Sequence, residues 1–363
     1  MFLYYWRHLL GILVFYLCYI HVFLSPLLSS RSLFLQQSLS LYQNIPIHLL
    51  GSLKATVSIF KYKPGILSTC LLFVDFFNEF DFWDSGNVSD PTADSTYPTA
   101  AYYMPKEAAQ NQSLAYVTDQ GNFRLGVDST FTYHGLDLRP SVRITSHKTI
   151  QQGLIIIDAA HVAYALTAWP SIWLTDVSQP WPTAGEIDIY ESVGLSHQNT
   201  MSYHTSSGCF YDANATQTGI LSTVSLDCNA LSNGDQACGS ADPNTNSFGE
   251  GANTGGGSVY ALEWTDSAMK MWHFNRVGVP ADITKGKPNP SVWGPPVANL
   301  ASTYCELNSY FGPQSLIMNI DLCGTWAGSV YPGGPQACFK YAQANPEAFK
   351  DAYFEIASVK FYQ

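Results

Sequence analysis

One short stretch of the chain, residues 181–191, constrains the fold more than any other. It reads Trp-Pro-Thr-Ala-Gly-Glu-Ile-Asp-Ile-Tyr-Glu and holds three acids, Glu186, Asp188 and Glu191. Glu186 and Asp188 alternate with isoleucines, and a period of two is typical of a β-strand. Side chains two residues apart share one face of a strand. We therefore expect these two carboxylates to point the same way.

Glu191 would lie on the opposite face of a regular strand. One extra residue in a β-bulge, at Ile189 or Tyr190, would bring Glu191 to the face of the other two acids and send Ile187 into the core. Three carboxylates on one face repel one another and lose hydration, which lowers stability. Such an arrangement indicates a functional site. The alternative is an ordinary solvated strand face.

The composition narrows the class of ligand. Charged residues are only 12% of the chain and aromatic residues 14%, and Tyr, Trp, Ser, Thr and Asn are frequent. This balance suits a secreted protein that handles an uncharged polar ligand. The net charge is −11, and no cluster of Lys and Arg occurs. Nucleic-acid binding is therefore not expected, because it requires a basic patch that neutralises phosphates.

The cysteines indicate an oxidising compartment. Six of the eight fall late in the chain, at Cys209, Cys228, Cys238, Cys305, Cys323 and Cys338. They lack paired C-x-x-C spacing, so we expect disulfides and no zinc site. Three glycosylation sequons, which begin at Asn87, Asn111 and Asn214, agree with this location.

The N-terminal part of the chain differs from the rest. Residues 9–28 contain no acid, Lys or Arg, and this apolar run is long enough to span a bilayer. Residues 1–28 are thus predicted to be a signal peptide or a signal-anchor helix. Residues 29–75 contain no acid until Asp75, show no clear period and stay unassigned, with an incorrect gene start as one explanation.

From residue 76 onward the pattern is that of many short strands. Strands are predicted at residues 123–127, 141–145, 154–158, 169–174, 201–205, 259–264, 269–274, 315–320 and 354–362, with one short helix at 346–353 and a long loop at 212–258. Residues 259–274 form a predicted hairpin. Short strands with turn signals and almost no helix predict an all-β sandwich or jelly roll.

The acidic stretch resembles the catalytic motif of glycoside hydrolase family 16 in its bulged, laminarinase-like form. Further segments resemble the fungal endo-1,3(4)-β-glucanase branch in collinear order over residues 76–363: Asp90-Pro-Thr, Ser141-Val-Arg-Ile, Trp169-Pro to Trp173, Trp181-Pro, His204-Thr, Gly255-Gly-Gly, Cys323-Gly-Thr-Trp-Ala-Gly and the closing Ala352-Tyr-Phe-Glu-Ile-Ala-Ser-Val. The resemblance implies a concanavalin-like β-jelly-roll of two curved antiparallel sheets, with a glucan cleft on the concave face.

The resemblance also implies a reaction and its residues. An endo-acting retaining hydrolase of β-1,3 or mixed β-1,3/1,4 glucan needs two carboxyls about 5–5.5 Å apart. Glu186 matches the nucleophile and Glu191 the acid/base. Asp188 lies between them, where its charge would raise the pKa of a neighbour. No cofactor or metal is implied for this reaction.

Residues outside the acidic motif match positions that bind the sugar. Trp173, Trp181 and Trp326 would stack on sugar rings, and His204 and Arg143 would reach hydroxyl groups. Each has a structural alternative. The tryptophans could be core residues, His204 a structural histidine, and Arg143 a member of a buried ion pair.

The sequence departs from the family pattern at several places. Tyr190 stands where the family mostly has an aliphatic residue, and two family cysteines are absent. The usual first strand, before the Phe-Phe segment at residue 76, is not recognisable. If the two absent cysteines normally pair with each other, the other bridges survive.

The resemblance leaves alternatives open. A cell-wall glucan transglycosylase would use the same acids, and an inactive glucan-binding protein would share the fold. The expected partner is a β-glucan polysaccharide, bound by a monomer that is either secreted or anchored to the membrane by residues 1–28 with the catalytic domain outside.

Overall fold

The computed structural model describes residues 67–70, 76–86, 99–221, 226–232 and 237–362. The chain divides into two units, Val57–Pro280 with Asn289–Gln363, and Met1–Thr56 with Ala281–Pro288. In the second of these, the described residues contain helix α5 (Ala281–Thr284). The predicted signal or anchor segment, residues 1–28, lies outside the described residues. So does most of the unassigned segment 29–75.

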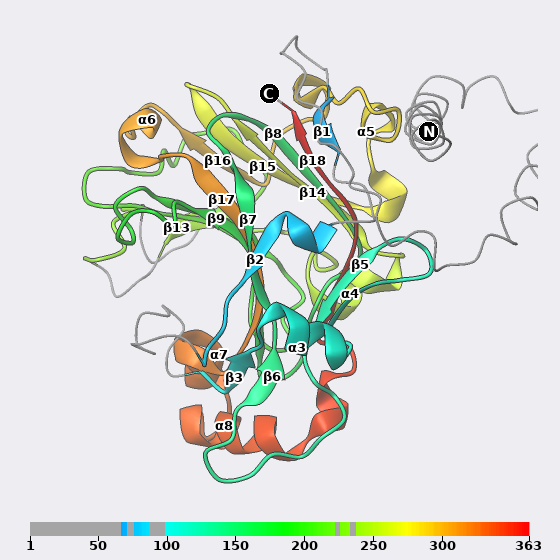
Figure 1. Ribbon diagram of the computed structural model, residues 1–363. Helices are drawn as coiled ribbons and strands as arrows, with labels where there is room; N and C mark the ends of the chain where they lie inside the picture. Colours follow the sequence, from blue (N-terminus) through cyan, green and yellow to red (C-terminus); the bar gives the residue numbers. More distant parts are fainter. Residues whose placement is uncertain (1–66, 71–75, 87–98, 222–225, 233–236, 363) are drawn as a thin grey trace, which may run out of the picture. The chain divides into compact units, whose positions relative to one another are not determined.

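Two large antiparallel sheets form the layers of the first unit (Figure 1). The first sheet has the order β16-β15-β14-β8-β18-β5-β4, with β1 also paired to β18. Its strands are β1 (Leu67–Cys70), β4 (Ala115–Val117), β5 (Phe123–Gly126), β8 (Gly153–His161), β14 (Ser258–Trp264), β15 (Ala268–Asn275), β16 (Ala298–Ala301) and β18 (Tyr353–Tyr362).

The second sheet has the order β12-β13-β11-β10-β9-β17-β7-β2. Its strands are β2 (Phe80–Phe82), β7 (Arg143–Ile150), β9 (Ala168–Thr175), β10 (Glu186–Glu191), β11 (Thr200–His204), β12 (Ile220–Leu221), β13 (Cys238–Ala241) and β17 (Gln314–Leu322). Two further short strands, β3 (Ala101–Tyr103) and β6 (Arg139–Ser141), pair in parallel. The acidic strand β10 thus lies in the middle of this sheet.

Alternate side chains of the strands fill the space between the layers. On β9, Ile172 and Leu174 are completely buried, and Ile155 and Ile157 of β8 come from the other sheet. Burying such a side chain contributes about 1.5–3 kcal/mol. Because these side chains point into the core, the residues that alternate with them on each strand point away from it.

The all-β sandwich predicted from the sequence is confirmed. The predicted strands at residues 123–127, 154–158, 259–264 and 269–274 correspond to β5, β8, β14 and β15, and the last two form the predicted hairpin. The predicted helix at 346–353 is a shorter 3-10 helix, η7 (Pro346–Phe349). The other 3-10 helices are η3 (Phe76–Asn78), η5 (Arg276–Gly278) and η6 (Pro290–Val292).

Helices occur where the sequence analysis expected none. The longest, α8 (Gly334–Ala344), begins with a proline in its first turn, where the missing N–H group costs nothing. The others are α3 (Lys106–Asn111), α4 (Gly249–Thr254), α6 (Leu307–Tyr310) and α7 (Gly324–Val330). The expected long loop 212–258 is also wrong in part, because it contains β12, β13 and α4. Strand β1 lies in the segment that had been left unassigned.

Three disulfides connect the late cysteines, as predicted. They are Cys209–Cys305, Cys228–Cys238 and Cys323–Cys338. The first joins the segment after β11 to the segment before α6, and the last joins the end of β17 to α8.

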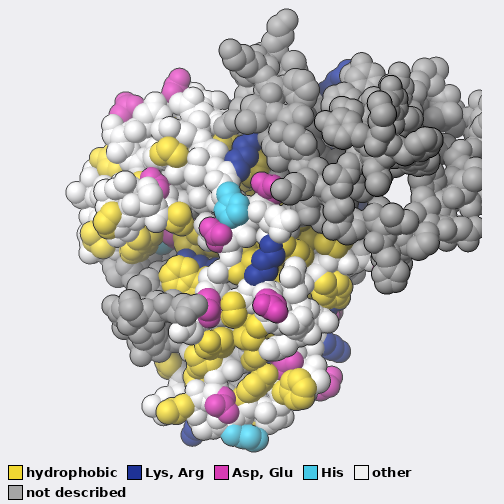
Figure 2. Space-filling view, viewed as in Figure 1, with side chains coloured by type: hydrophobic (Ala, Val, Ile, Leu, Met, Phe, Trp, Pro, Cys, Tyr) yellow, Lys and Arg dark blue, Asp and Glu magenta, His cyan; other side chains and the backbone are white. Residues whose placement is uncertain are grey.

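The surface shown in Figure 2 carries few charges. On this face of the described residues, Lys and Arg side chains lie singly among acidic, polar and hydrophobic ones. No helix in the part of the chain that the structure describes is long and apolar enough to cross a membrane.

We predict that the disulfides differ in their contribution to stability. Cys209 and Cys305 are 96 residues apart, whereas Cys228 and Cys238 are 10 apart. All four side chains are buried. Closing a longer loop restricts the unfolded chain more, so paired replacement by Ala should lower the free energy of unfolding by about 4–5 kcal/mol for the long loop and about 2–3 kcal/mol for the short one. Guanidinium denaturation of the two double variants measures this, and equal losses would contradict it.

Candidate active site

Strand β10 carries an irregularity between its second and third acids. Along β9, Asp188 pairs with Trp173 and Tyr190 pairs with Ile172, so that Ile189 is one extra residue on β10. The register with β11 shifts over the same segment. The β-bulge predicted from the sequence is therefore confirmed, at one of the two predicted positions.

The bulge sends two successive side chains of β10, Ile189 and Tyr190, into the core. Ile187, Ile189 and Tyr190 are all completely buried. Tyr190 stacks on Phe248 with ring centroids 4.8 Å apart, and its hydroxyl donates to the carbonyl of Ala163 at 2.9 Å. Tyr190, which departs from the family pattern, is thus a satisfied core residue.

Gly185 fixes the entry of the chain into β10. Its φ is +76°, and a Cβ atom added there would overlap the ring of Phe311. Only glycine adopts this backbone conformation without strain and also leaves room for the ring. The strand consequently starts at a defined position with respect to Phe311.

Glu186 lies between an indole and an imidazole. Trp181 Nε1 donates to Oε2 at 2.8 Å, and His204 Nε2 lies 3.6 Å from Oε1. Burial and then the negative charge of Asp188 raise the pKa of Glu186 to about 8, against the opposing effects of His204, Trp181 and Arg143. These three groups favour the ionised carboxylate.

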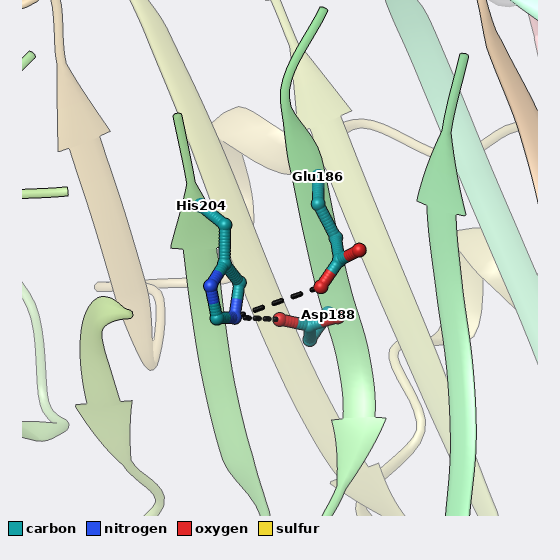
Figure 3. A group of neighbouring side chains, drawn as sticks. All are labelled: Glu186, Asp188 and His204. Carbon is teal, nitrogen blue, oxygen red and sulfur yellow. Dashed lines mark ion pairs between the residues drawn. The ribbon is translucent and has the colours of Figure 1, made fainter. Parts of the chain in front are cut away.

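Asp188 faces the same imidazole from the middle of the strand (Figure 3). It is almost fully buried, at 1% exposed. Its Oδ2 accepts from Ser202 Oγ at 3.0 Å and lies 3.4 Å from His204 Nε2. Burial alone would lower the pKa of His204, but Glu186 and Asp188 outweigh it and raise the pKa to about 9. The two carboxylates therefore favour the protonated, cationic ring.

Glu191 is held by β9. Trp169 Nε1 donates to its Oε1 at 2.7 Å, and Ser171 Oγ donates to the same oxygen at 3.1 Å. Burial, followed by the charge of Asp188, raises the pKa of Glu191 to about 8, whereas the indole N–H group lowers it. Both of these donors are neutral, in contrast to the cation beside Glu186.

The predicted sugar-binding residues lie around these acids. Trp173 is 8% exposed, and its Nε1 donates to Asn319 Oδ1 at 2.7 Å. The guanidinium of Arg143 lies 4.7 Å from the ring centroid of Trp83 and 5.3 Å from that of Trp173. Trp326, on α7, contacts Trp169 edge to face with centroids 5.7 Å apart.

Each predicted residue thus contacts the acids or a neighbour of the acids. Trp181 and His204 touch Glu186 directly, and Trp326 reaches Glu191 through Trp169. Their contact with a sugar stays a prediction. A buried ion pair is formed by another arginine, Arg139, whose Nη1 lies 3.2 Å from Oδ2 of Asp128.

Four residues that form hydrogen bonds to the acids or to Trp173 were not predicted from the sequence. They are Trp169, Ser171, Ser202 and Asn319. Trp169 and Ser171 alternate with core residues on the strand before the acids, and this period was available in the sequence. Ser202 and Asn319 come from β11 and β17, and their proximity depends on the order of the strands.

Comparisons with known proteins identify the family of this chain. The sequence model of the XgeA-like catalytic domain of glycoside hydrolase family 16 matches residues 83–362. The chain belongs to glycoside hydrolase family 16.

Among curated relatives of this family 16 chain, a probable endo-1,3(4)-β-glucanase of Aspergillus fumigatus is 38% identical over 301 residues, which are 79% of this chain and 44% of that protein. The chain thus spans less than half the length of this relative.

Two solved structures are similar over most of their length. Laminarinase 16A from Phanerochaete chrysosporium, with β-glucans in its donor and acceptor sites, has 34% identity and a TM-score of 0.74. An elongating family 16 β-1,3-glucosyltransferase has 34% identity and a TM-score of 0.73. Each similarity covers 82% of this chain and 99% of the other.

One group in this family 16 site has the donor atoms of a metal centre. Glu186, Asp188 and His204 each offer one ligand atom, and these atoms lie within 4.8 Å of one another. A metal would require neutral imidazole. The raised pKa of His204 favours the proton instead, and the imidazolium itself supplies positive charge between the two carboxylates.

We predict that Glu186 maintains the imidazolium. In Glu186→Gln one of the three carboxylates that raise the pKa of His204 is replaced by a neutral amide, so the pKa of His204 should fall below about 9. A histidine NMR titration of the wild type and the variant measures this. Glu347→Gln, which removes an exposed carboxylate outside the cluster, is the control and should leave the titration unchanged. An equal pKa in Glu186→Gln would contradict the expected coupling.

Proposed function

We propose that this protein is an endo-acting retaining hydrolase of β-1,3 or mixed β-1,3/1,4 glucan, with Glu186 as nucleophile and Glu191 as acid/base. The observation that carries the proposal is the difference between the surroundings of the two glutamates. Glu186 lies beside a cation and an indole N–H group, whereas Glu191 has neutral donors only.

This difference suits two distinct roles in one reaction. A nucleophile must be ionised, and the imidazolium of His204 and the N–H group of Trp181 stabilise the carboxylate of Glu186. A general acid must carry a proton near neutral pH. Burial and the charge of Asp188 raise the pKa of both glutamates to about 8. The assignment of roles therefore rests on the local donors: the cation beside Glu186 favours its ionised form, and Glu191, with neutral donors, retains the proton.

The proposed reaction has two displacements. The Glu186 carboxylate forms a bond to the anomeric carbon while the glycosidic bond breaks, and Glu191 gives its proton to the leaving oxygen. In the second step Glu191, now a carboxylate, takes a proton from water. The resulting oxygen attacks the anomeric carbon and releases Glu186. Two inversions retain the β configuration, and the expected separation of the two carboxyls, about 5–5.5 Å, stays a prediction.

Asp188 has an electrostatic and a positioning role in this proposal. Its charge raises the pKa of both glutamates. Its contact with His204 keeps the imidazolium beside Glu186. Because Glu186 loses its negative charge in the glycosyl-enzyme, Asp188 then remains the carboxylate nearest the cation.

The proposed substrate follows from the relatives and the aromatic residues. The similar laminarinase holds β-glucans in its donor and acceptor sites, and the similar curated protein is a probable endo-1,3(4)-β-glucanase. Trp173, Trp181 and Trp326 would supply stacking surfaces, and Arg143 and His204 would contact hydroxyl groups.

We also propose that residues 76–363 form the catalytic domain and act as a monomer outside the cell. Support for the location comes from the three disulfides, which persist in oxidising compartments. Secretion or anchoring by residues 1–28 belongs to the same proposal.

Reducing-end release from laminarin tests the proposed hydrolysis. The full chain, produced in a eukaryotic secretory host, should release oligosaccharides of several lengths. Glu186→Gln should lose at least about 1000-fold in kcat, because no covalent intermediate can form. Products longer than the substrate would indicate transglycosylation, as the similar glucosyltransferase performs. Tight binding of laminarin by an inactive wild type would indicate a glucan-binding protein.

Azide distinguishes the two glutamates in the same experiment. In Glu191→Ala, azide attacks the glycosyl-enzyme, so the product should be a β-glycosyl azide. In Glu186→Ala, with an aryl β-glycoside as donor, azide attacks the anomeric carbon directly from the side of the lost carboxylate. The phenolate leaves, and an α-glycosyl azide forms by a single inversion. A variant that gives an α-azide from a β-linked substrate would mark the nucleophile position, and an α product from Glu191→Ala would reverse the assignment.

We predict that Trp169 sets the alkaline limit of activity. Its N–H group favours ionised Glu191, so Trp169→Phe should raise the pKa of Glu191 and move the alkaline limb of the kcat/KM profile to higher pH. Trp173→Phe is the matched control, because its N–H group binds Asn319 instead. An unchanged limb in Trp169→Phe, or the same shift in both variants, would contradict the prediction.

A further inference from the structure

At the bulge, two backbone groups of β10 do not have the backbone partners on β11 that a regular ladder would give them. They are the carbonyl of Ile189 and the N–H group of Glu191, on either side of Tyr190. Toward β11, the register changes between Asp188 and Glu191. Buried backbone groups of this kind need partners, because each unpaired one is costly.

One side chain supplies both partners. Asn199, directly before β11, accepts the N–H group of Glu191 on Oδ1 at 2.8 Å and donates from Nδ2 to the carbonyl of Ile189 at 2.8 Å. Its carboxamide thus takes the place of a peptide group of the neighbouring strand. Of the short side chains, only Asn offers a donor and an acceptor side by side.

Asn199 is itself held in place. It is completely buried. Its N–H group donates to Ser247 Oγ at 2.9 Å, and its carbonyl accepts from the N–H group of Asp242 at 2.8 Å. The hydroxyl of Ser247 in turn donates to the carbonyl of Asn244 at 2.7 Å. The carboxamide therefore has a fixed position from which to hold the bulge.

We propose that Asn199 is a positioning residue for the acid/base, because its bridge across the bulge keeps Glu191 on the face of Glu186 and Asp188. The inference rests on the proposed function and deepens it. Without the bridge, β10 is free to relax toward a regular period of two, in which Glu191 turns away from Trp169 and Ser171. The residue never touches the substrate and acts through the backbone of Glu191.

The test uses two substrates of the full-length enzyme. Laminarin needs a proton from the acid for its leaving oxygen. An aryl β-laminaribioside with a good leaving group does not, and azide replaces the base in the second step. Asn199→Ala should lose about 10–100-fold in kcat on laminarin with KM little changed, the cost expected for a displacement of about 1 Å. On the aryl substrate with azide it should lose less than about threefold, because that route does not use Glu191.

Asn253 offers a matched control. Its side chain also brackets a backbone segment, accepting the N–H group of Val162 at 2.8 Å and donating to the carbonyl of the same residue at 2.9 Å. It lies on α4 and not at the acids. Asn253→Ala should therefore lower stability without a difference between the two substrates. Asn199→Asp retains the acceptor for Glu191 and loses the donor to Ile189, so its loss on laminarin should be intermediate, and it serves as the test if Asn199→Ala does not fold.

The results separate the inference from the proposed function. Equal losses on both substrates, or full activity of Asn199→Ala on laminarin, would overturn the positioning role. If the wild type cleaves neither substrate, the proposed function fails, and amide hydrogen exchange decides the bridge by itself. Exchange at the Glu191 amide should then be at least about tenfold faster in Asn199→Ala and unchanged in Asn253→Ala. Unchanged exchange in both would overturn the bridge.

Discussion

Buried negative charge at β10 is the constraint on which the rest of the site depends. Three carboxylates on one strand face repel one another, and burial raises the pKa of Glu186 and of Glu191 to about 8. The chain offsets this with two positively charged side chains, His204 and Arg143, and with N–H and O–H donors from the strands on both sides. Such a group persists only where every neighbour is in a fixed place.

The order of the strands provides these neighbours. β11 contributes Ser202 and His204, and β9 contributes Trp169, Ser171 and Trp173. One strand further, Asn319 of β17 accepts from Trp173. The next strand, β7, contributes Arg143, whose guanidinium contacts the ring of Trp173. Trp173 is thus held by residues of β17 and β7, support that a central strand has and an edge strand or a loop lacks.

The bulge connects the core to the chemistry. Ile189 and Tyr190 both enter the core, where Tyr190 packs against Phe248, and this double insertion turns Glu191 to the outer face. A substitution that changes the packing of the core at this point would also change the direction of Glu191. Stability and geometry of the site are thus coupled through three residues of one strand.

The sequence by itself determined the strand, its bulge, the three acids and the sandwich architecture. These follow from local periodicity, because side-chain direction in a strand depends only on position along it. The sequence also indicated disulfides among the late cysteines, but not which cysteines pair. It also indicated His204 and Trp181 through resemblance to family 16. It did not indicate helix α8, whose start at Gly334–Pro335 gives no apolar period. Nor did it indicate Ser202, Asn319 or Asn199, since their roles depend on which strands become neighbours. Only the tertiary structure decided that a cation lies beside Glu186 while Glu191 has neutral donors. His204 comes from β11, and Trp169 and Ser171 come from β9. These residues meet because the two strands lie on either side of β10 in one sheet.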